Sequence, residues 1–110
     1  MKTLATCLLG CLLFVATGAY AVQDVSVSGC KDWNVDKFNR VALAAFAKRE
    51  FFIEKNDGQS VIGSRKKYKV EIVLAKPDLI EIRWVPGFGY HKENWLIALK
   101  KDVTSFLVAC

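Results

Sequence analysis

Residues 68–84 read YKVEIVLAKPDLIEIRW, and this stretch decides what kind of fold the rest of the chain completes. Apolar and charged side chains alternate on both sides of Pro77, which is the pattern of two strands buried on one face. Lys76-Pro77-Asp78 contains typical turn residues and is the expected loop. The stretch therefore predicts an antiparallel hairpin with one apolar face and one charged face.

The charges of this hairpin also predict its register. Because both apolar sets must face the same side, paired residue numbers must sum to an even number. Pairing Ile72 with Ile82 places Glu71 opposite Arg83, whereas a shift of two places Glu71 opposite Glu81. Like charges directly opposite each other are unfavourable, so we predict the first register.

A second hairpin is expected before the first one. The segment Asn56-Asp57-Gly58-Gln59 carries an Asp-Gly turn signal between a strand that starts at Phe51 and a strand at 60–65. Gly63 either weakens the second of these strands or marks a bulge. The polar residues 22–29 are expected to form a loose lead or a short edge strand.

Two amphipathic helices flank the strands. Apolar residues recur at spacings of three and four from about Val35 to Arg49, behind Asp32 or Asn34 as the N-cap. A second helix is expected to begin between His91 and Asn94 and to end near Val108. The expected fold class is α+β, a two-layer sandwich in the order helix, four-stranded antiparallel sheet, helix, with both helices on one sheet face. Trp84 and Trp95 are expected in the core, and Trp33 is expected to pack over the first helix.

The N-terminal residues have the pattern of a secretory signal peptide. Lys2 precedes an apolar run from Leu4 to Ala16, and the small residues around Tyr20 fit cleavage after Ala21. We therefore expect a periplasmic or secreted protein in which residues 22–110 form one domain. An uncleaved anchor and lipidation at Cys11 remain as alternatives, although the apolar run is shorter than the ~20 residues of a membrane span.

Two of the four cysteines, Cys30 and Cys110, remain after this cleavage. A pair of cysteines in an exported chain indicates a disulfide, and this one would close nearly the whole domain. Two free thiols are the alternative. No further residue of metal-ligating type lies near either cysteine in the sequence, so we expect no metal site there.

Several apolar positions match a known kind of protein. The chain resembles small exported bacterial envelope proteins and lipoproteins of unknown function that end in a Trp-x-x-x-Leu helix. The matching residues are Arg49, Phe51-Phe52-Ile53, Lys69 to Ile72, Ile80-Glu81-Ile82, and Trp95 with Leu99 and Val103. Such proteins often carry Gly where this chain has Glu50, and their His lies further before the Trp than His91 does. The resemblance implies an envelope location and supplies no catalytic residue.

Catalytic chemistry is not expected. His91 is the only histidine, and nothing in the sequence indicates an orienting partner for it. The patterns of nucleophile elbows, zinc proteases and phosphate-binding loops do not occur. We therefore expect neither an enzyme nor a cofactor; a small hydrolase that depends on His91 is the third hypothesis.

Two groups of residues are candidates for binding. The loop at 86–90 carries Phe88 and Tyr90 just before His91, and aromatic residues on loops are suitable anchors for a protein partner unless they turn into the core. A second, basic set could bind a polyanion such as lipopolysaccharide or nucleic acid, or could simply keep the sheet face solvated: Arg65, Lys66, Lys67, Lys69 and Arg83. The preferred function is a non-catalytic binding or adaptor protein for another envelope or secreted protein, and polyanion binding is the alternative.

Overall fold

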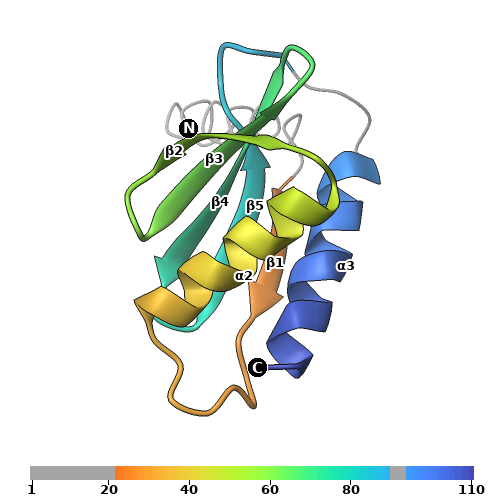
Figure 1. Ribbon diagram of the computed structural model, residues 1–110. Coiled ribbons are helices and arrows are strands. Elements are labelled where there is room, and N and C mark those ends of the chain that lie inside the picture. Colours follow the sequence, from red (N-terminus) through yellow and green to blue (C-terminus); the bar gives the residue numbers. More distant parts are fainter. Residues whose placement is uncertain (1–21, 90–93) are drawn as a thin grey trace, which may run out of the picture.

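The predicted hairpin at residues 68–84 lies at the centre of a five-stranded antiparallel sheet in the computed structural model, which describes residues 22–89 and 94–110 (Figure 1). The strand order is β1-β5-β4-β3-β2, and two helices contact each other and the sheet. The α+β class is confirmed. The elements are β1 (Val22–Ser26), α2 (Val35–Lys48), β2 (Phe52–Asn56), β3 (Ser60–Arg65), β4 (Tyr68–Lys76), β5 (Leu79–Trp84) and α3 (Asn94–Val108).

The predicted register of the central hairpin is confirmed. Ile72 pairs with Ile82, and Glu71 lies opposite Arg83. The loop is shorter than predicted, because the register shifts at the end of β4 and Lys76 pairs with Leu79. The loop therefore consists of Pro77 and Asp78, and Ala75 is the extra, unpaired residue at the shift.

The prediction of four strands was one strand short. Residues 22–26 form β1, which pairs antiparallel with β5 at the edge of the sheet. Val25 is the only buried residue of this strand, and it lies opposite Ile80. A single buried side chain gives too weak an alternation to distinguish a strand from a loose lead.

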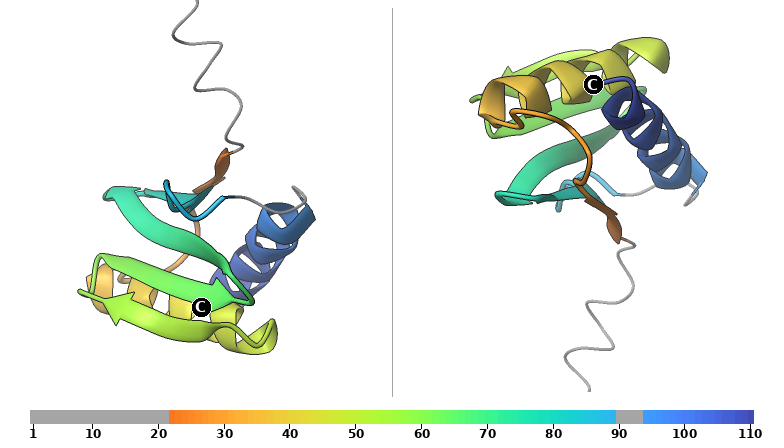
Figure 2. Two further views of the ribbon diagram at one scale, coloured as in Figure 1. Left: turned by 90° about the horizontal axis from the view of Figure 1, so that it is seen from above. Right: turned by 90° about the horizontal axis from the view of Figure 1, so that it is seen from below.

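One hydrophobic core joins the apolar face of the sheet to both helices. α2 packs against β2, β3 and β4, and α3 packs against β1 and β5, around a strongly twisted sheet (Figure 2). The predicted stripe of α2 is buried in full: Phe38, Val41, Ala42, Ala45 and Phe46. In α3 the buried apolar residues are Leu96, Leu99, Val103 and Leu107, whereas Trp95 and Phe106 are partly buried against the core.

α2 begins and ends with hydrogen-bonded caps. Asn34, rather than Asp32, is the N-cap, and its side chain accepts a hydrogen bond from the backbone N–H of Lys37. At the other end Phe51 donates to the carbonyl of Phe46, and the rings of these two residues lie 5.1 Å apart. This is a Schellman motif with its usual hydrophobic contact.

Glu50 occupies the left-handed position of this motif. Its φ is 62°, a conformation that glycine adopts without the steric cost of a Cβ atom. Glu50 also donates its backbone N–H to the carbonyl of Ala47. Glycine would thus be favourable at position 50 of this chain, where the proteins that it resembles often carry Gly.

Gly63 lets α2 approach the sheet closely. A Cβ atom at this position would lie 2.9 Å from the ring of Phe46, which is closer than real contacts allow. The bulge of this region is in the opposite strand, where the pairing shifts between Ile53 and Lys55. Gly63 is therefore needed for packing rather than for a bulge of its own.

The disulfide between Cys30 and Cys110 is present, with the two Cα atoms 5.5 Å apart. It joins the segment before α2 to the segment after α3. Trp33, in the same connection, donates its indole N–H to the carbonyl of Pro77 and packs against the core. The disulfide is compatible with an oxidising, extracytoplasmic compartment.

Candidate binding surfaces

The outer face of the sheet, opposite the core, carries charges that are largely paired with each other. Arg83 donates to Glu71 at 2.9 Å and to Glu81 at 3.1 Å. Ser60 donates its hydroxyl to the other carboxylate oxygen of Glu71. The cross-strand pair that predicted the register is thus also an ion pair. The charge of Arg83 is neutralised by carboxylates on the same face of the sheet.

The structure does not bring the five predicted polyanion-binding residues into one cluster. Lys69 and Arg83 lie on the outer face, whereas Arg65 lies 5.4 Å from the ring centre of Trp95 in α3. Lys66 and Lys67 are exposed in the turn between β3 and β4. Only these two of the five thus form a contiguous, exposed pair without a carboxylate partner in the described part of the chain.

A different group of residues is continuous on the outer face. Lys69 lies with its ammonium 4.3 Å from the ring centre of Phe88 and 3.9 Å from the carboxylate of Glu54. Ser64, beside Lys69 in the sheet, donates its hydroxyl to Glu54 at 2.6 Å. On its other side Ser64 pairs with Phe52. We call these five residues the Phe88 surface.

The two aromatic rings of the Phe88 surface are exposed. Phe52 keeps 75% of its surface accessible and Phe88 keeps 44%. The sequence left open whether Phe88 turns into the core, and the structure places it outside. Tyr90 and His91, the other two predicted partner-binding residues, lie outside the described residues.

The surface was only partly visible in the sequence. Phe88 and Lys69 were singled out, in two separate hypotheses. Phe52 was named only within the resemblance, and Glu54 was not a candidate. The signal that could have joined them is the pairing of β2 with β3, which depends on a bulge between Ile53 and Lys55 that the sequence did not indicate.

A buried ion pair lies between the two helices. Asp102 of α3 has only 3% of its side chain exposed, and Arg49 donates to both of its carboxylate oxygens, at 2.6 and 3.1 Å. Lys48 lies 3.3 Å from the same carboxylate. Burial by itself raises the pKa of Asp102, but the hydrogen bonds and charges of Arg49 and Lys48 outweigh it, so that the pKa is lowered. The hydrogen bond to Asp102 in turn raises the pKa of Arg49.

This pair is structural in character and was not predicted. Asp102 falls between Leu99 and Val103 on the apolar stripe of α3. A charged residue within an apolar stripe is the sequence signal that could have predicted a buried ion pair. Arg49 donates to both carboxylate oxygens, and the lowered pKa of Asp102 favours its ionised form, as expected of a structural ion pair. The pair therefore joins the end of α2 to α3.

Among residues 22–89 and 94–110, no three or more His, Cys, Asp or Glu side chains gather as ligands for a metal ion. None of the helices in the described part of the chain is long and apolar enough to cross a membrane.

Comparison of the chain with protein-family models, with curated proteins and with solved structures found no match. The resemblance to small exported envelope proteins stays a prediction.

Proposed function

We propose that the chain is an exported, non-catalytic protein that binds another envelope or secreted protein through the Phe88 surface. The observation that carries this proposal is the pair of exposed rings, Phe52 and Phe88, at the two ends of one row of polar side chains. Exposed aromatic rings supply most of the binding energy in many protein interfaces, and a rim of polar groups around them excludes water.

The polar residues between the rings support the same proposal. Lys69, Glu54 and Ser64 make hydrogen bonds or ion pairs with each other. A partner can cover them without leaving a buried charge unpaired, which would be costly. The mixed charge of this row fits a protein partner with one apolar contact surrounded by polar groups.

Polyanion binding is the alternative, with Lys66 and Lys67 as its best-placed residues. Arg83 is already held by two carboxylates, and a phosphate would have to displace them. Such binding would be steeply dependent on salt, because it releases counterions.

A pull-down from envelope extract with the tagged, disulfide-intact protein tests the proposal. We expect a stoichiometric protein that survives a high-salt wash. The variants Phe88→Ala and Phe52→Ala should each lose it, while Ile97→Ala, which removes an equally exposed apolar side chain from α3, should retain it. Circular dichroism confirms that each variant is folded.

Three results would contradict the proposal. Material that is held only at low salt and is lost with Lys66→Gln and Lys67→Gln would favour the polyanion alternative. If the captured partner is still retained by all three alanine variants, at Phe88, Phe52 and Ile97, the interface lies elsewhere. Hydrolase activity that His91→Ala abolishes would favour the third hypothesis.

A further inference from the structure

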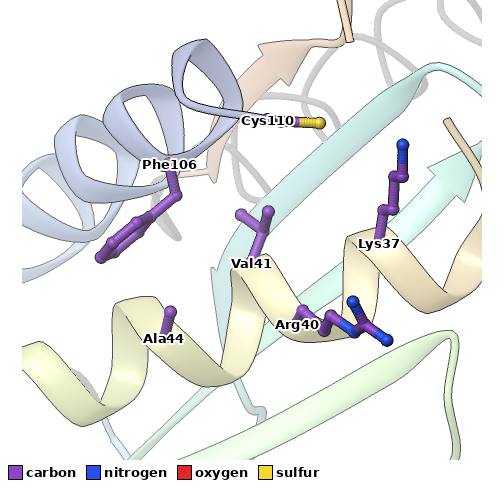
Figure 3. A pocket seen from close by; sticks show the side chains of 6 residues that line it. All are labelled: Lys37, Arg40, Val41, Ala44, Phe106 and Cys110. Atoms are coloured by element: carbon purple, nitrogen blue, oxygen red, sulfur yellow. The ribbon is translucent and has the colours of Figure 1, made fainter. Parts of the chain in front are cut away.

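A groove runs between α2 and α3 on a different side of the molecule from the Phe88 surface (Figure 3). Its volume is about 310 Å³, at the lower end of the range for small-molecule sites. Four lining residues come from one stripe of α2, and the other two come from the end of α3. The six are Lys37, Arg40, Val41, Ala44, Phe106 and Cys110.

The two ends of the groove differ in chemistry. Figure 3 shows Phe106 facing Ala44 at one end and Val41 in the middle. Toward the other end Lys37 extends to the side of Cys110, and the side chain of Arg40 extends away from Cys110. The ring, the two aliphatic side chains and the disulfide sulfur make the floor apolar. Lys37 and Arg40 are the charged side chains of the lining, and both are cationic.

The cations of the groove are available to a ligand. Arg40 is exposed, and no hydrogen bond or ion pair engages its guanidinium in the described part of the chain. The ammonium of Lys37 donates to the carbonyl of Lys31, which uses one of its three N–H groups. The other three arginines each have a partner. Arg49 is paired with Asp102 and Arg83 with two glutamates, whereas Arg65 lies against the ring of Trp95. Arg40 differs from all three, because neither a carboxylate nor an aromatic ring engages it in the described part of the chain and an apolar groove lies beside it.

We propose that this groove binds a small anionic amphiphile, a single alkyl chain with one carboxylate or phosphate headgroup. The headgroup lies at Lys37, and the exposed side chain of Arg40 turns toward it, since a guanidinium can hold a carboxylate or phosphate with two parallel hydrogen bonds. The alkyl chain lies along Val41 and Ala44 toward Phe106 and is removed from water there. The site does not depend on the Phe88 surface, and either proposal can fail without the other.

The charge pattern decides between this ligand and the other small molecules that an apolar groove could take. A neutral alkyl alcohol gains the same apolar contacts but no charge-assisted hydrogen bonds. A cationic amphiphile is repelled by Lys37 and Arg40. The affinity order is therefore predicted to be anionic, then neutral, then cationic, for chains of equal length.

Titration of the isotope-labelled, disulfide-intact protein by NMR tests this order. The probes are decanoate, decyl phosphate, decanol and decyltrimethylammonium, each below its micelle concentration. We expect saturable binding of decanoate or decyl phosphate, with the largest amide shifts at 37–44 and 106–110. Whichever of the two binds more tightly identifies carboxylate or phosphate as the preferred headgroup, and both results support the shared chemistry.

Variants separate the headgroup from the chain. Lys37→Gln with Arg40→Gln should weaken decanoate binding roughly tenfold, which is the size of one lost charge-assisted hydrogen bond, and should leave decanol binding unchanged. Lys101→Gln, which removes an exposed cation of α3 outside the groove, is the matched control and should have no effect. Ala44→Trp should block all four probes by filling the groove.

Three results would overturn the proposal. Decanol that binds as tightly as decanoate would show an apolar surface without headgroup recognition. Unchanged decanoate affinity in the Lys37→Gln, Arg40→Gln variant would show that the cations do not act. Absence of saturable binding by both anionic probes would show that the groove is not a ligand site.

Discussion

Arg49, the C-cap of α2, holds both carboxylate oxygens of Asp102, a buried residue of α3 that lies 53 positions further along the chain. The side chain of Arg49 is 38% exposed, whereas the side chain of Asp102 is 3% exposed. Water can therefore hydrate Arg49 if Asp102 is replaced. If Arg49 is replaced, Asp102 stays buried without that partner. The consequences of a substitution should differ accordingly between the two residues.

Asp102→Asn should lower the free energy of unfolding at pH 7 by about 2 kcal/mol, since the remaining Arg49 is partly exposed to water and the amide still accepts one hydrogen bond. Urea denaturation measures this value. Asp78→Asn, at an exposed turn, is the control and should change stability little. A double-mutant cycle with Arg49→Gln isolates the coupling, and additive effects would show that the pair contributes nothing.

The same pair predicts a dependence on pH. Because the pKa of Asp102 is lower in the folded protein than in the unfolded chain, its contribution to stability is fully present above the unfolded value of about 4. The contribution is lost as the pH falls through the lower, folded value. The stability difference between wild type and Asp102→Asn should therefore shrink below pH ~4. A difference that stays constant down to pH ~2 would contradict the pKa shift.

Gly63→Ala should be destabilising by about 1–3 kcal/mol, because the added methyl group meets the ring of Phe46 and one of them must move. The measurement is urea denaturation in two backgrounds. In Phe46→Leu the ring is gone, and the same substitution should cost clearly less. Equal penalties in both backgrounds would mean that the ring is not the cause.

Glu50→Gly should raise the stability by about 0.5 kcal/mol, since relief of the left-handed conformation slightly exceeds the added flexibility of the unfolded chain. Glu50→Ala is the matched control, because it removes the same carboxylate but keeps a Cβ atom at φ 62°. Thermal denaturation at constant pH compares the three proteins. A gain for Ala equal to that for Gly would place the effect in the charge rather than in the backbone.

Loss of the disulfide should lower the stability by up to about 4.5 kcal/mol, the loop-entropy value for its separation of 80 residues. The double variant Cys30→Ser, Cys110→Ser measures this loss by urea denaturation. Intact mass before and after reduction checks the bond. A mass that does not change on reduction would mean that both cysteines are free thiols.

The parts of the fold that could be predicted are those in which side chains alternate strongly or carry opposed charges. The hairpin at 68–84 and its register followed from Glu71 and Arg83, and the stripe of α2 followed from its apolar spacing. β1 could not be distinguished from a lead, because Val25 alone is buried and the pairing energy comes from β5. The shift at the end of β4 is a local backbone adjustment that no side-chain pattern encodes.

The surfaces were harder to predict than the core for a related reason. Whether Arg83 is free or held depends on Glu81 and Glu71 being within reach at once, which is a property of the assembled sheet. The groove depends on the angle at which α2 and α3 meet. Its α2 residues share a stripe in the sequence, but Phe106 and Cys110 join them only after folding.

The bond between Cys30 and Cys110 turns the region from α2 to α3 into a covalent ring, and only β1 among the described strands lies outside it. A single cut by a protease in any turn of this ring, including the exposed Pro77-Asp78 turn, opens the chain but releases no fragment. The two pieces stay tethered and can re-pair at high effective concentration. One nick would therefore leave a protein of unchanged size under non-reducing conditions, and a second cut would be needed to release a fragment.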